Sequence, residues 1–320
     1  MIGGAATEAA TGSAVGAATE AAAGSAVGAA QGRLQDVLVG LGSVVVAFSG
    51  GADSAFLAWS ATRLLGRERV LCATAVSPSL APAERRACEE LAQAWGLRWQ
   101  EVATAEMDDA RYRANGPDRC YHCKAALMEA LEPLAASEGA TVVLGVNLDD
   151  LGDHRPGQRA AAQGGARFPL VEAGFDKAMV RAASRGAGLV TWDKPAAPCL
   201  ASRLPYGTPV TLGTLRSVAA AEAGLHALGF ADVRVRHYGD LARVEVPVAD
   251  LGLCVDRREE VVDVVRRAGY RYVTVDLQGL RSGNLNAAAG VGAPNAPAGY
   301  GAGPVAAGRP ARPAAAGEAR

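Results

Sequence analysis

The sequence predicts an α/β protein: a doubly wound parallel sheet followed by a second, smaller α+β domain. Between residues 32 and 150, apolar strand patterns alternate with helix patterns, which is the order of a parallel sheet covered by helices. One apolar run, residues 44–48, is short, β-branched and uninterrupted, as expected of a central strand. After about residue 205 the order changes to helix, strand, strand, helix, strand, which favours a small antiparallel or mixed sheet.

In the first domain, strands and helices are expected to alternate. The strands are predicted at residues 44–48, 70–76, 97–102 and 141–146. The helices are predicted at residues 32–41, 54–65, 82–95 and 119–137. Doubly wound sheets bind ligands at the carboxyl ends of their strands, and Ser49, Ser77 and Asn147 fall at such ends.

The second domain and two low-complexity ends complete the predicted organisation. We expect helices at residues 212–228 and 256–268, and strands at 231–237, 241–246 and 270–275. Near the N-terminus, an alanine- and glycine-rich segment at residues 5–16 recurs at residues 17–28 with one change, Thr11 to Ala23. The predicted units are a disordered or loosely helical extension at 1–31, the α/β domain at 32–205, the smaller α+β domain at 206–286 and a disordered tail at 287–320.

Charge, hydropathy and cysteine usage exclude several classes of protein. The 320 residues include 32 Lys and Arg against 33 Asp and Glu, a net charge of −1, so no nucleic-acid partner is expected. No apolar stretch has the length of a membrane span, and residues 1–30 lack the basic start and apolar core of a secretory signal. Six unevenly spaced cysteines then favour a reducing, cytoplasmic location where thiols serve chemistry or metals.

The turn after the first strand has the features of a phosphate-binding loop. Gly50 and Gly51 have no Cβ atom, so the backbone can turn sharply and approach a ligand closely. Asp53 and Ser54 then open a helix whose free N–H groups and positive dipole end face the loop. A Walker loop would contain a lysine, which this turn lacks. The simpler alternative is an ordinary helix cap after a Gly-Gly turn.

The segment SGGADS, residues 49–54, resembles the PP-loop of the ATP pyrophosphatases. These enzymes have a HUP-like α/β fold, cut ATP between its α- and β-phosphates, and adenylate a substrate. The resemblance implies that the loop amides, Ser49 and Ser54 hold the departing pyrophosphate, and that Asp53 helps to place Mg²⁺. Residues 32–205 would then form a PP-loop ATP pyrophosphatase domain.

Two cysteines stand three residues apart at the start of the helix predicted at 119–137. At this spacing the sulfur atoms of Cys120 and Cys123 can meet one metal. The helix N-terminus, Arg119 and Lys124 are expected to lower the pKa of both thiols. Taken alone, the pair is consistent with half of a zinc site, with a redox pair or with coincidence.

Carboxylates follow the fourth predicted strand in the segment GVNLDDLGD, residues 145–153. Gly145 and Asn147 leave the strand at the end where ATP would bind, and we expect both to contact ATP. Asp150 and Asp153 are candidate ligands of Mg²⁺, which is commonly held by few carboxylates beside phosphates. The same residues would also suit an acidic surface loop before the next helix.

A third cysteine of interest lies in a proline-rich loop at residues 192–207. Cys199 is followed four residues later by Arg203, a positive charge that would favour thiolate, the form required of a nucleophile or sulfur donor. The alternative for Cys199 is a small buried cysteine. That is our interpretation of the remaining three, Cys72, Cys88 and Cys254.

Two arginines alternate along a predicted strand of the second domain. Because side chains two residues apart share one face of a strand, Arg234 and Arg236 form a two-pronged site for a substrate phosphate or carboxylate. With Arg203 they are the predicted substrate-phosphate residues. A solvated, charged strand face is the alternative.

Taken together, these segments resemble the LarE family, the ATP-dependent sulfur transferases that build the nickel-pincer nucleotide cofactor of lactate racemase. The resemblance runs from about residue 32 to residue 286 and rests on SGGADS, PDRCYHCK, GVNLDDLGDHRPG, DKPAAPCLASRLPYG, RVRHYGDLARVEV and VDLQGLRSGNLN. It implies that ATP adenylates a carboxylate of pyridinium-3,5-biscarboxylate mononucleotide. It also implies that Cys199 attacks with loss of AMP, and that its sulfur stays on the product as a thiocarboxylate.

The number of cysteines matters within this family. Members with one such cysteine resemble sacrificial donors, which give up their own sulfur once and keep dehydroalanine. This sequence also contains Cys120 and Cys123, and it resembles the subgroup in which three cysteines hold an iron–sulfur cluster. Three thiolates leave one iron of a [4Fe–4S] cluster without a protein ligand, an open position for an extra sulfide. A Zn²⁺ site completed by His122 or His154 stays open as an alternative.

Rival interpretations come from other classes. Another PP-loop enzyme, such as a tRNA thiolase or an amide-forming synthase of the NAD, GMP or asparagine type, would share the loop. A tRNA enzyme should show a basic surface, and an ammonia-using synthase has no use for three loop cysteines. A nucleotide or iron–sulfur sensor is the non-enzymatic alternative, and it would not release AMP. By analogy with the family, we expect a homo-oligomer.

Overall fold

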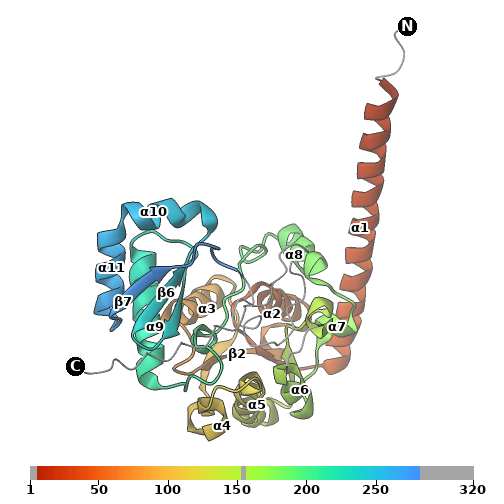
Figure 1. Cartoon of the computed structure of the whole chain (residues 1–320). Coiled ribbons are helices and arrows are strands. Elements are labelled where there is room, and N and C mark those ends of the chain that lie inside the picture. Colours follow the sequence, from red (N-terminus) through yellow and green to blue (C-terminus); the bar gives the residue numbers. More distant parts are fainter. Residues whose placement is uncertain (1–5, 153–155, 282–320) are drawn as a thin grey trace, which may run out of the picture.

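The computed structural model describes residues 6–152 and 156–281, with side chains from residue 24 onward (Figure 1). Its first unit is built on four strands, β1 (Val44–Ala47), β2 (Val70–Val76), β3 (Trp99–Ala103) and β4 (Thr141–Leu144). The strand order is β3-β2-β1-β4, and every neighbouring pair is parallel. The order reverses between β1 and β4, which is where ligands bind in this fold class.

Helices cover both faces of this sheet, which confirms the doubly wound α/β fold. One face is covered by α1 (Ala6–Leu41), α2 (Ala52–Leu65), α3 (Pro82–Ala94) and α8 (Lys177–Gly186). The other face is covered by α5 (Arg119–Glu138) and α6 (Pro156–Gln163). Val44 and Val46 of β1 point into the first core and Val45 into the second, as the alternation along a strand requires.

Helix α1 begins earlier than the helix predicted at 32–41. It starts at Ala6 and includes most of the repeated segment, for which a disordered or loosely helical extension was expected. Alanine has the highest helix propensity, so a helix anchored in the folded unit can continue through two alanine-rich copies. The C-terminal part of α1 is packed, with Ala30, Leu34 and Leu38 buried in the core. Its N-terminal part projects away from the other elements (Figure 1).

Several short helices were not predicted. They are α4 (Ala110–Arg113) before α5, and α6, α7 (Pro169–Glu172) and α8 after β4. These helices are one to three turns long, and so short a segment carries little periodic signal. Residue 167, between α6 and α7, forms an isolated parallel bridge with Val143 of β4.

The second unit has a mixed three-stranded sheet, as predicted. Its elements are α9 (Leu212–Ala227), β5 (Arg234–Tyr238), β6 (Leu241–Glu245), α10 (Leu251–Asp256), α11 (Arg258–Arg267) and β7 (Tyr272–Val275). The order is β5-β6-β7, with β5 antiparallel and β7 parallel to β6. Leu225 of α9 and Val265 of α11 pack on Val235 and Val244 of the sheet. The domain bounds at residues 31, 205 and 286 stay predictions, and residues 282–320 lie outside the described part of the chain.

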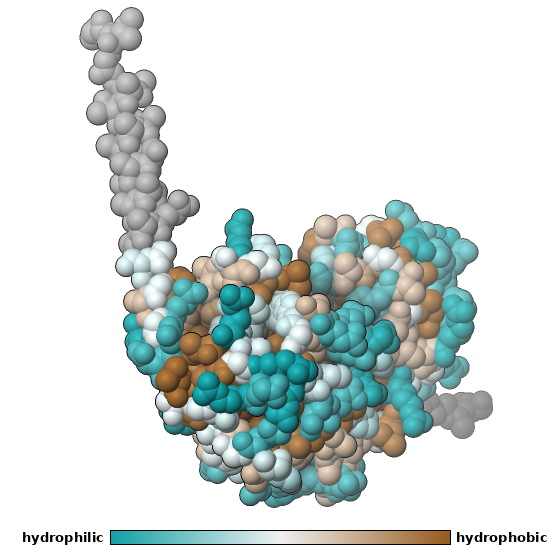
Figure 2. All heavy atoms as spheres, turned by 180° about the vertical axis from the view of Figure 1, so that it is seen from behind, coloured by the Kyte–Doolittle hydropathy of each residue, from teal (hydrophilic) through white to brown (hydrophobic). Residues whose placement is uncertain are grey.

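The surface mixes polar and apolar side chains. Figure 2 shows teal and brown residues interspersed over both units of the molecule. Across the described residues, every helix is too short or too polar to cross a membrane.

Candidate active site

The loop after β1 is closed by hydrogen bonds between its own serines. The hydroxyl oxygen of Ser54 lies 3.0 Å from that of Ser49 and accepts a hydrogen bond from the Ser49 backbone nitrogen at 3.3 Å. The Ser54 hydroxyl also donates to the carbonyl oxygen of Gly51 at 3.1 Å. Gly50 has a φ of +66°, a left-handed conformation that favours glycine. The loop is therefore preformed at the N-terminus of α2, where backbone N–H groups can receive an anion.

Gly145, just beyond β4, packs directly against the start of α2. A Cβ atom at residue 145 would lie 2.7 Å from the backbone nitrogen of Ser54, closer than real Cβ atoms approach other atoms. The chain segments on either side of the switch point are thus in contact, and glycine is the residue that fits between them. Two of the predicted ATP-binding residues, Gly145 and Ser54, are brought together here.

Asp53 belongs to a cluster of polar side chains from three segments. Its carboxylate accepts hydrogen bonds from the ammonium group of Lys177 at 2.6 Å and from the side-chain amide of Asn147 at 3.2 Å. The backbone nitrogen of Asn147 donates to a carboxylate oxygen of Asp150 at 3.1 Å. The structure therefore assembles Asp53, Asn147 and Asp150, while Asp153 lies outside the described residues.

Two lysines at the loop were not predicted. Lys177 binds Asp53 although the two residues are 124 positions apart in the chain. Lys194 donates to the carbonyl oxygen of Gly50 at 3.2 Å and to the carboxylate of Glu84 at 2.8 Å. Both lysines were visible in the sequence, one beginning α8 and one in the proline-rich loop. No local pattern connects either of them with the turn after β1.

Asp53 and Asp150 fit a Mg²⁺ site that is completed by phosphates. Mg²⁺ commonly takes one or two protein carboxylates, and phosphate oxygens and waters complete its coordination. Lys177 already neutralises Asp53, so this lysine would share the carboxylate with an arriving metal or turn toward the phosphates. Within the described part of the chain, no group of three or more His, Cys, Asp or Glu side chains is arranged to hold a metal ion.

The three predicted site cysteines come from two segments. Cys120 and Cys123 lie in the first turns of α5, and Cys199 directly precedes the 3-10 helix η4 (Leu200–Arg203). Cys123 and Cys199 are half-buried and pack on the same apolar cluster, while Cys120 is exposed. The other three cysteines are buried, as predicted.

The thiol of Cys123 is less acidic than expected. Burial, followed by the charges of Cys199 and Glu106, raises the pKa of Cys123 to about 12. The expectation of a lowered pKa was wrong for this residue, because desolvation outweighs the helix N-terminus and the nearby Lys124.

Arg119 joins the two cysteine segments. Its guanidinium donates to the carbonyl oxygen of Ala201 at 2.7 Å and to the side-chain oxygen of Asn115 at 2.6 Å. It also lies 3.9 Å from the sulfur atom of Cys120. Asn115 in turn donates to the carbonyl oxygen of Pro205 in the Cys199 loop and to that of Thr208 just after it, both at 2.8 Å. The start of α5 and the Cys199 loop are therefore held together by buried hydrogen bonds.

The loop after β2 reaches the same turn. The carbonyl oxygen of Ser79 accepts a hydrogen bond from the backbone nitrogen of Leu200 at 2.9 Å, and the Ser79 hydroxyl pairs with the hydroxyl of Tyr112. Ser77, predicted to contact ATP, stabilises this loop by accepting a hydrogen bond from the Ser79 backbone nitrogen at 3.2 Å. Ser77 and Leu200 both line a hollow of about 320 Å³.

Both ring nitrogens of His122 are paired with carboxylates. Nδ1 lies 3.3 Å from Asp109, and Nε2 lies 3.1 Å from Asp118. In this arrangement the buried ring offers no free nitrogen to a metal beside Cys120 and Cys123. His154, the other histidine considered for a zinc site, lies outside the described residues.

Two of the three predicted phosphate-binding arginines are buried in ion pairs. Arg203 donates to Glu222 through two nitrogens, at 2.8 and 3.1 Å. Arg236 donates to the fully buried Glu245 at 2.9 Å. Each guanidinium also donates to a carbonyl oxygen of the Cys199 loop, at 2.6 Å from Arg203 and 2.9 Å from Arg236. These two side chains therefore hold the loop in place.

Arg234 differs from the other two arginines. It has no carboxylate partner among the described residues, and its guanidinium makes a long hydrogen bond of 3.5 Å to the carbonyl oxygen of Ala196. Burial, followed by the positive charges of Arg203 and Arg236, lowers the pKa of Arg234. An incoming anion would relieve this crowding of like charges, so Arg234 is the best placed of the three to bind a phosphate.

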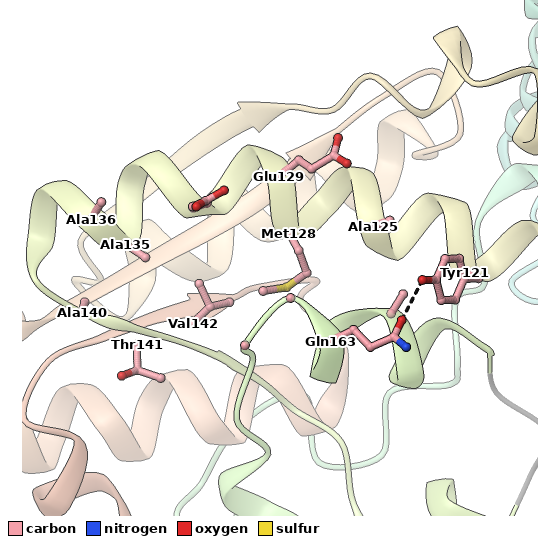
Figure 3. A pocket seen from close by; sticks show the side chains of 14 residues that line it. Tyr121, Ala125, Met128, Glu129, Ala135, Ala136, Ala140, Thr141, Val142 and Gln163 are labelled. Carbon is pink, nitrogen blue, oxygen red and sulfur yellow. Dashed lines mark hydrogen bonds between the residues drawn. The ribbon is translucent and has the colours of Figure 1, made fainter.

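A separate groove runs along α5. It has a volume of about 700 Å³ and is lined by residues of α5, β4 and α6, as Figure 3 shows. At one end Tyr121 donates a hydrogen bond to Gln163 at 2.7 Å. None of the predicted site residues lines this groove, so it is not part of the candidate active site.

Comparison with known proteins places this site in a wider context. No protein-family model matches the chain. It is 44% identical over 249 residues to an uncharacterized protein of Synechocystis, covering 77% of this chain and 92% of that protein. It is 39% identical over 244 residues to the pyridinium-3,5-bisthiocarboxylic acid mononucleotide synthase of Lactiplantibacillus plantarum, covering 76% of this chain and 88% of that enzyme. A protein of Methanocaldococcus jannaschii is 24% identical over 240 residues.

Proposed function

The chain belongs to the LarE family of ATP-dependent sulfur transferases, and from this premise we propose its reaction. The enzyme uses ATP to adenylate a carboxylate of pyridinium-3,5-biscarboxylate mononucleotide and converts it into a thiocarboxylate for the nickel-pincer cofactor. The main structural support for this proposal is one hydrogen bond. Lys194, five residues before Cys199, donates to the carbonyl oxygen of Gly50 at 3.2 Å, so the sulfur-bearing loop touches the phosphate-binding loop.

In the first half-reaction, the ATP phosphates occupy the loop at residues 49–54. An oxygen of the substrate carboxylate attacks the α-phosphorus, and the bond to the bridging oxygen of pyrophosphate breaks, which leaves an acyl adenylate. Backbone N–H groups at the start of α2 and the ammonium groups of Lys177 and Lys194 neutralise the charge that develops on pyrophosphate. Asp53 and Asp150 would hold Mg²⁺, which supplies further neutralisation when it is bound.

In the second half-reaction, a sulfur atom attacks the carboxyl carbon of the adenylate, and AMP leaves with the electron pair of the broken C–O bond. As a sacrificial donor, Cys199 would first form a thioester; loss of its Cα proton would then break the Cβ–Sγ bond, release the thiocarboxylate and leave dehydroalanine. In the alternative with an iron–sulfur cluster, Cys199 would instead help to hold the cluster. Its turn is held on one side by Arg119 and on the other by Arg203 and Arg236, which limits the movement of the sulfur atom. Arg234 is the proposed partner of the substrate phosphate.

By residue type, Cys120, Cys123 and Cys199 fit the donor set of an iron–sulfur cluster, although the described side chains are not grouped as a metal site. They are thiols from two segments that the Arg119 hydrogen bonds keep together, and the charges of Cys120 and Cys199 both act on Cys123. When bound, a [4Fe–4S] cluster would supply an iron without a protein ligand, where a transferable sulfide can reside. The chain itself contributes the rigid frame around these sulfur atoms.

The proposed enzyme works in the cytoplasm, without nucleic acid, and as a homo-oligomer. All six cysteines are free thiols in the structure, which suits a reducing compartment. The near balance of 32 basic and 33 acidic residues supports a small-molecule substrate over a polyanion. Light scattering coupled to size-exclusion chromatography would measure the number of subunits.

The test is anaerobic purification followed by turnover with ATP and the pyridinium substrate. We expect AMP, pyrophosphate and thiocarboxylate from the wild type, and AMP without thiocarboxylate from Cys199→Ala. Cys254→Ala, in the core of the second unit, is the matched control and should keep both products. The absence of AMP in the wild type would contradict the proposal.

The source of the sulfur needs a second measurement. Iron and sulfide that are lost in Cys120→Ala, together with several products per chain, would support the cluster. One product per chain, with the mass of one sulfur lost from Cys199, would instead identify a sacrificial donor.

A further inference from the structure

Glu106 has no role in the reaction described above, and its surroundings are unusual for a carboxylate. It opens the 3-10 helix η2 (Glu106–Asp108) that follows β3, and its exposed fraction is 2%. One of its carboxylate oxygens, Oε2, is buried without a hydrogen-bond donor anywhere in the described residues. Buried carboxylates are normally paired or hydrogen-bonded, so this oxygen requires a partner that these residues do not supply.

Glu106 borders the region of sulfur transfer. Its negative charge acts on both Cys123 and Tyr112 and helps to raise the pKa of each. The next residue, Met107, packs on the same apolar cluster as Cys123 and Cys199. Helix η2 also packs against α5, the helix that carries Cys123. The unpaired carboxylate therefore lies close to the apolar cluster on which Cys123 and Cys199 pack.

The neighbours of Glu106 limit the kind of partner it can have. Cys123 and Tyr112 become anions when they ionise, so neither can neutralise a carboxylate. The guanidinium of Arg119 donates to Asn115 and to the carbonyl oxygen of the Cys199 turn, and among the described residues it donates no hydrogen bond to Glu106 Oε2. A ligand with a positive charge would pair with the carboxylate without a further protein donor.

The substrate of the proposed reaction carries such a charge. Its ring nitrogen is a permanent cation, because it is bonded to the ribose and has no proton to lose. Both carboxyl carbons are attached to the same ring, so the carbon that sulfur attacks is only three bonds away from the charged nitrogen. A ring placed for attack at Cys199 would therefore bring its positive charge into the region that Glu106 borders.

We propose that Glu106 is a specificity-determining residue that recognises the positive charge of the pyridinium ring. The inference rests on the proposed function, because it takes the pyridinium mononucleotide as substrate. Glu106 makes and breaks no bond. It selects a cationic ring over a neutral ring of the same shape, while Arg234 binds the anionic phosphate at the other end of the molecule.

The first test compares two ligands on the full-length protein by calorimetry, without ATP. One is pyridinium-3,5-biscarboxylate mononucleotide, and the other is its neutral analogue, a benzene-3,5-dicarboxylate joined to ribose phosphate through carbon. A buried charge pair should make the cationic ligand bind about tenfold more tightly to the wild type. Equal affinities in the wild type would overturn the proposal whatever the variants do.

The second test removes the charge and keeps the shape of the side chain. Glu106→Gln is expected to lower the affinity for the cationic ligand about tenfold and to change the affinity for the neutral analogue by less than about twofold. Asp108→Asn is the matched control, because it makes the same charge change in the same short helix at an exposed side chain. Unchanged binding of the cationic ligand to Glu106→Gln would reject the proposal.

Thermal unfolding separates recognition from a structural role. Glu106→Gln should have a Tm at least as high as the wild type, because it removes an unpaired buried charge, and the cationic ligand should raise that Tm less. A lower Tm with equal losses for both ligands would contradict the proposal. None of these measurements uses ATP, so a failure to form AMP would count against the proposed function while leaving the result on Glu106 intact.

Discussion

The guanidinium of Arg119 donates a hydrogen bond to the carbonyl oxygen of Ala201 at 2.7 Å, across 82 residues of sequence. This bond joins the helix of Cys120 and Cys123 to the turn that follows Cys199. Arg119 is 5% exposed, so the bond is shielded from water, and its loss would leave the Ala201 carbonyl oxygen with only the longer hydrogen bond from the Leu204 backbone nitrogen, at 3.2 Å. The relative position of the three sulfur atoms therefore depends in part on this buried side chain.

Arg119→Lys should separate the two half-reactions. Lysine keeps the charge but not the fixed planar guanidinium, in which one nitrogen donates to both Asn115 and Ala201 while the other lies beside Cys120. We expect thiocarboxylate formation to fall about tenfold or more while AMP formation stays nearly unchanged, because the phosphate-binding loop is not disturbed. Both products can be quantified by mass spectrometry. Arg111→Lys, at an exposed position, is the control, and equal losses of AMP and thiocarboxylate would contradict the expectation.

Lys177→Gln should impair adenylation. The ammonium group of Lys177 contacts Asp53 at 2.6 Å, beside the loop where pyrophosphate would leave. Removing a preorganised charge at such a position typically lowers the rate about 100-fold or more. ATP–pyrophosphate exchange in the presence of substrate measures this step. Arg181→Gln, on the exposed face of the same helix, should retain the exchange rate, and a normal rate in Lys177→Gln would exclude a role for this lysine.

Gly145→Ala should distort the phosphate-binding loop. The added Cβ atom would lie 2.7 Å from the Ser54 backbone nitrogen, so β4 or α2 must move. We expect a stability loss of about 1–3 kcal/mol in urea unfolding and weaker ATP binding. Gly186→Ala is the matched control, since no atom lies within 4 Å of the position that its added methyl group would take. Wild-type ATP affinity in Gly145→Ala would show that the contact is adaptable.

The buried ion pair of Arg203 and Glu222 should contribute far more to the free energy of unfolding than a surface ion pair does. Arg203→Met leaves Glu222 buried without its partner, which typically costs about 3–5 kcal/mol of unfolding free energy. The side chains are 8% and 9% exposed, so water screens the charge little. Urea unfolding measures the loss, and the double variant with Glu222→Leu should recover part of it. Arg85→Met breaks the exposed pair with Glu101 and should change stability little.

Acid unfolding should depend on Asp109. Its hydrogen bonds with the Arg111 side chain come first among the causes that lower the pKa of Asp109 to about 2. A depressed pKa means that the stabilisation is present above the unfolded-state pKa of about 3.9 and is lost as pH falls toward 2. Asp109→Asn should unfold with a weaker dependence on pH between about 4 and 2. The same dependence in both proteins would assign acid unfolding to other carboxylates.

Much of the fold could be predicted from the sequence because the signals are local. The apolar runs at β1, β2 and β4, and the glycines of the loop at residues 49–54, lie within short contiguous segments whose periodicity and backbone freedom specify their conformation. The parallel sheet with helices on both faces followed from the alternation of strands and helices. The single-turn helices α4 and α7 were not predictable, since each is too short for a periodic pattern, whereas α8 is as long as the predicted α11 and was missed although Asp176 caps it and its apolar residues share one face.

The features of the candidate site also divide into those that the sequence predicts and those that depend on tertiary packing. The sequence by itself predicted the candidate phosphate-binding loop, the three candidate site cysteines and the arginine strand, because each is a compact motif. The tertiary structure decided that Lys177 reaches Asp53, that Arg203 and Arg236 are paired with buried glutamates while Arg234 is not, and that burial makes Cys123 a weaker acid. These properties depend on desolvation and on partners distant in the chain, which packing brings together and no contiguous pattern specifies.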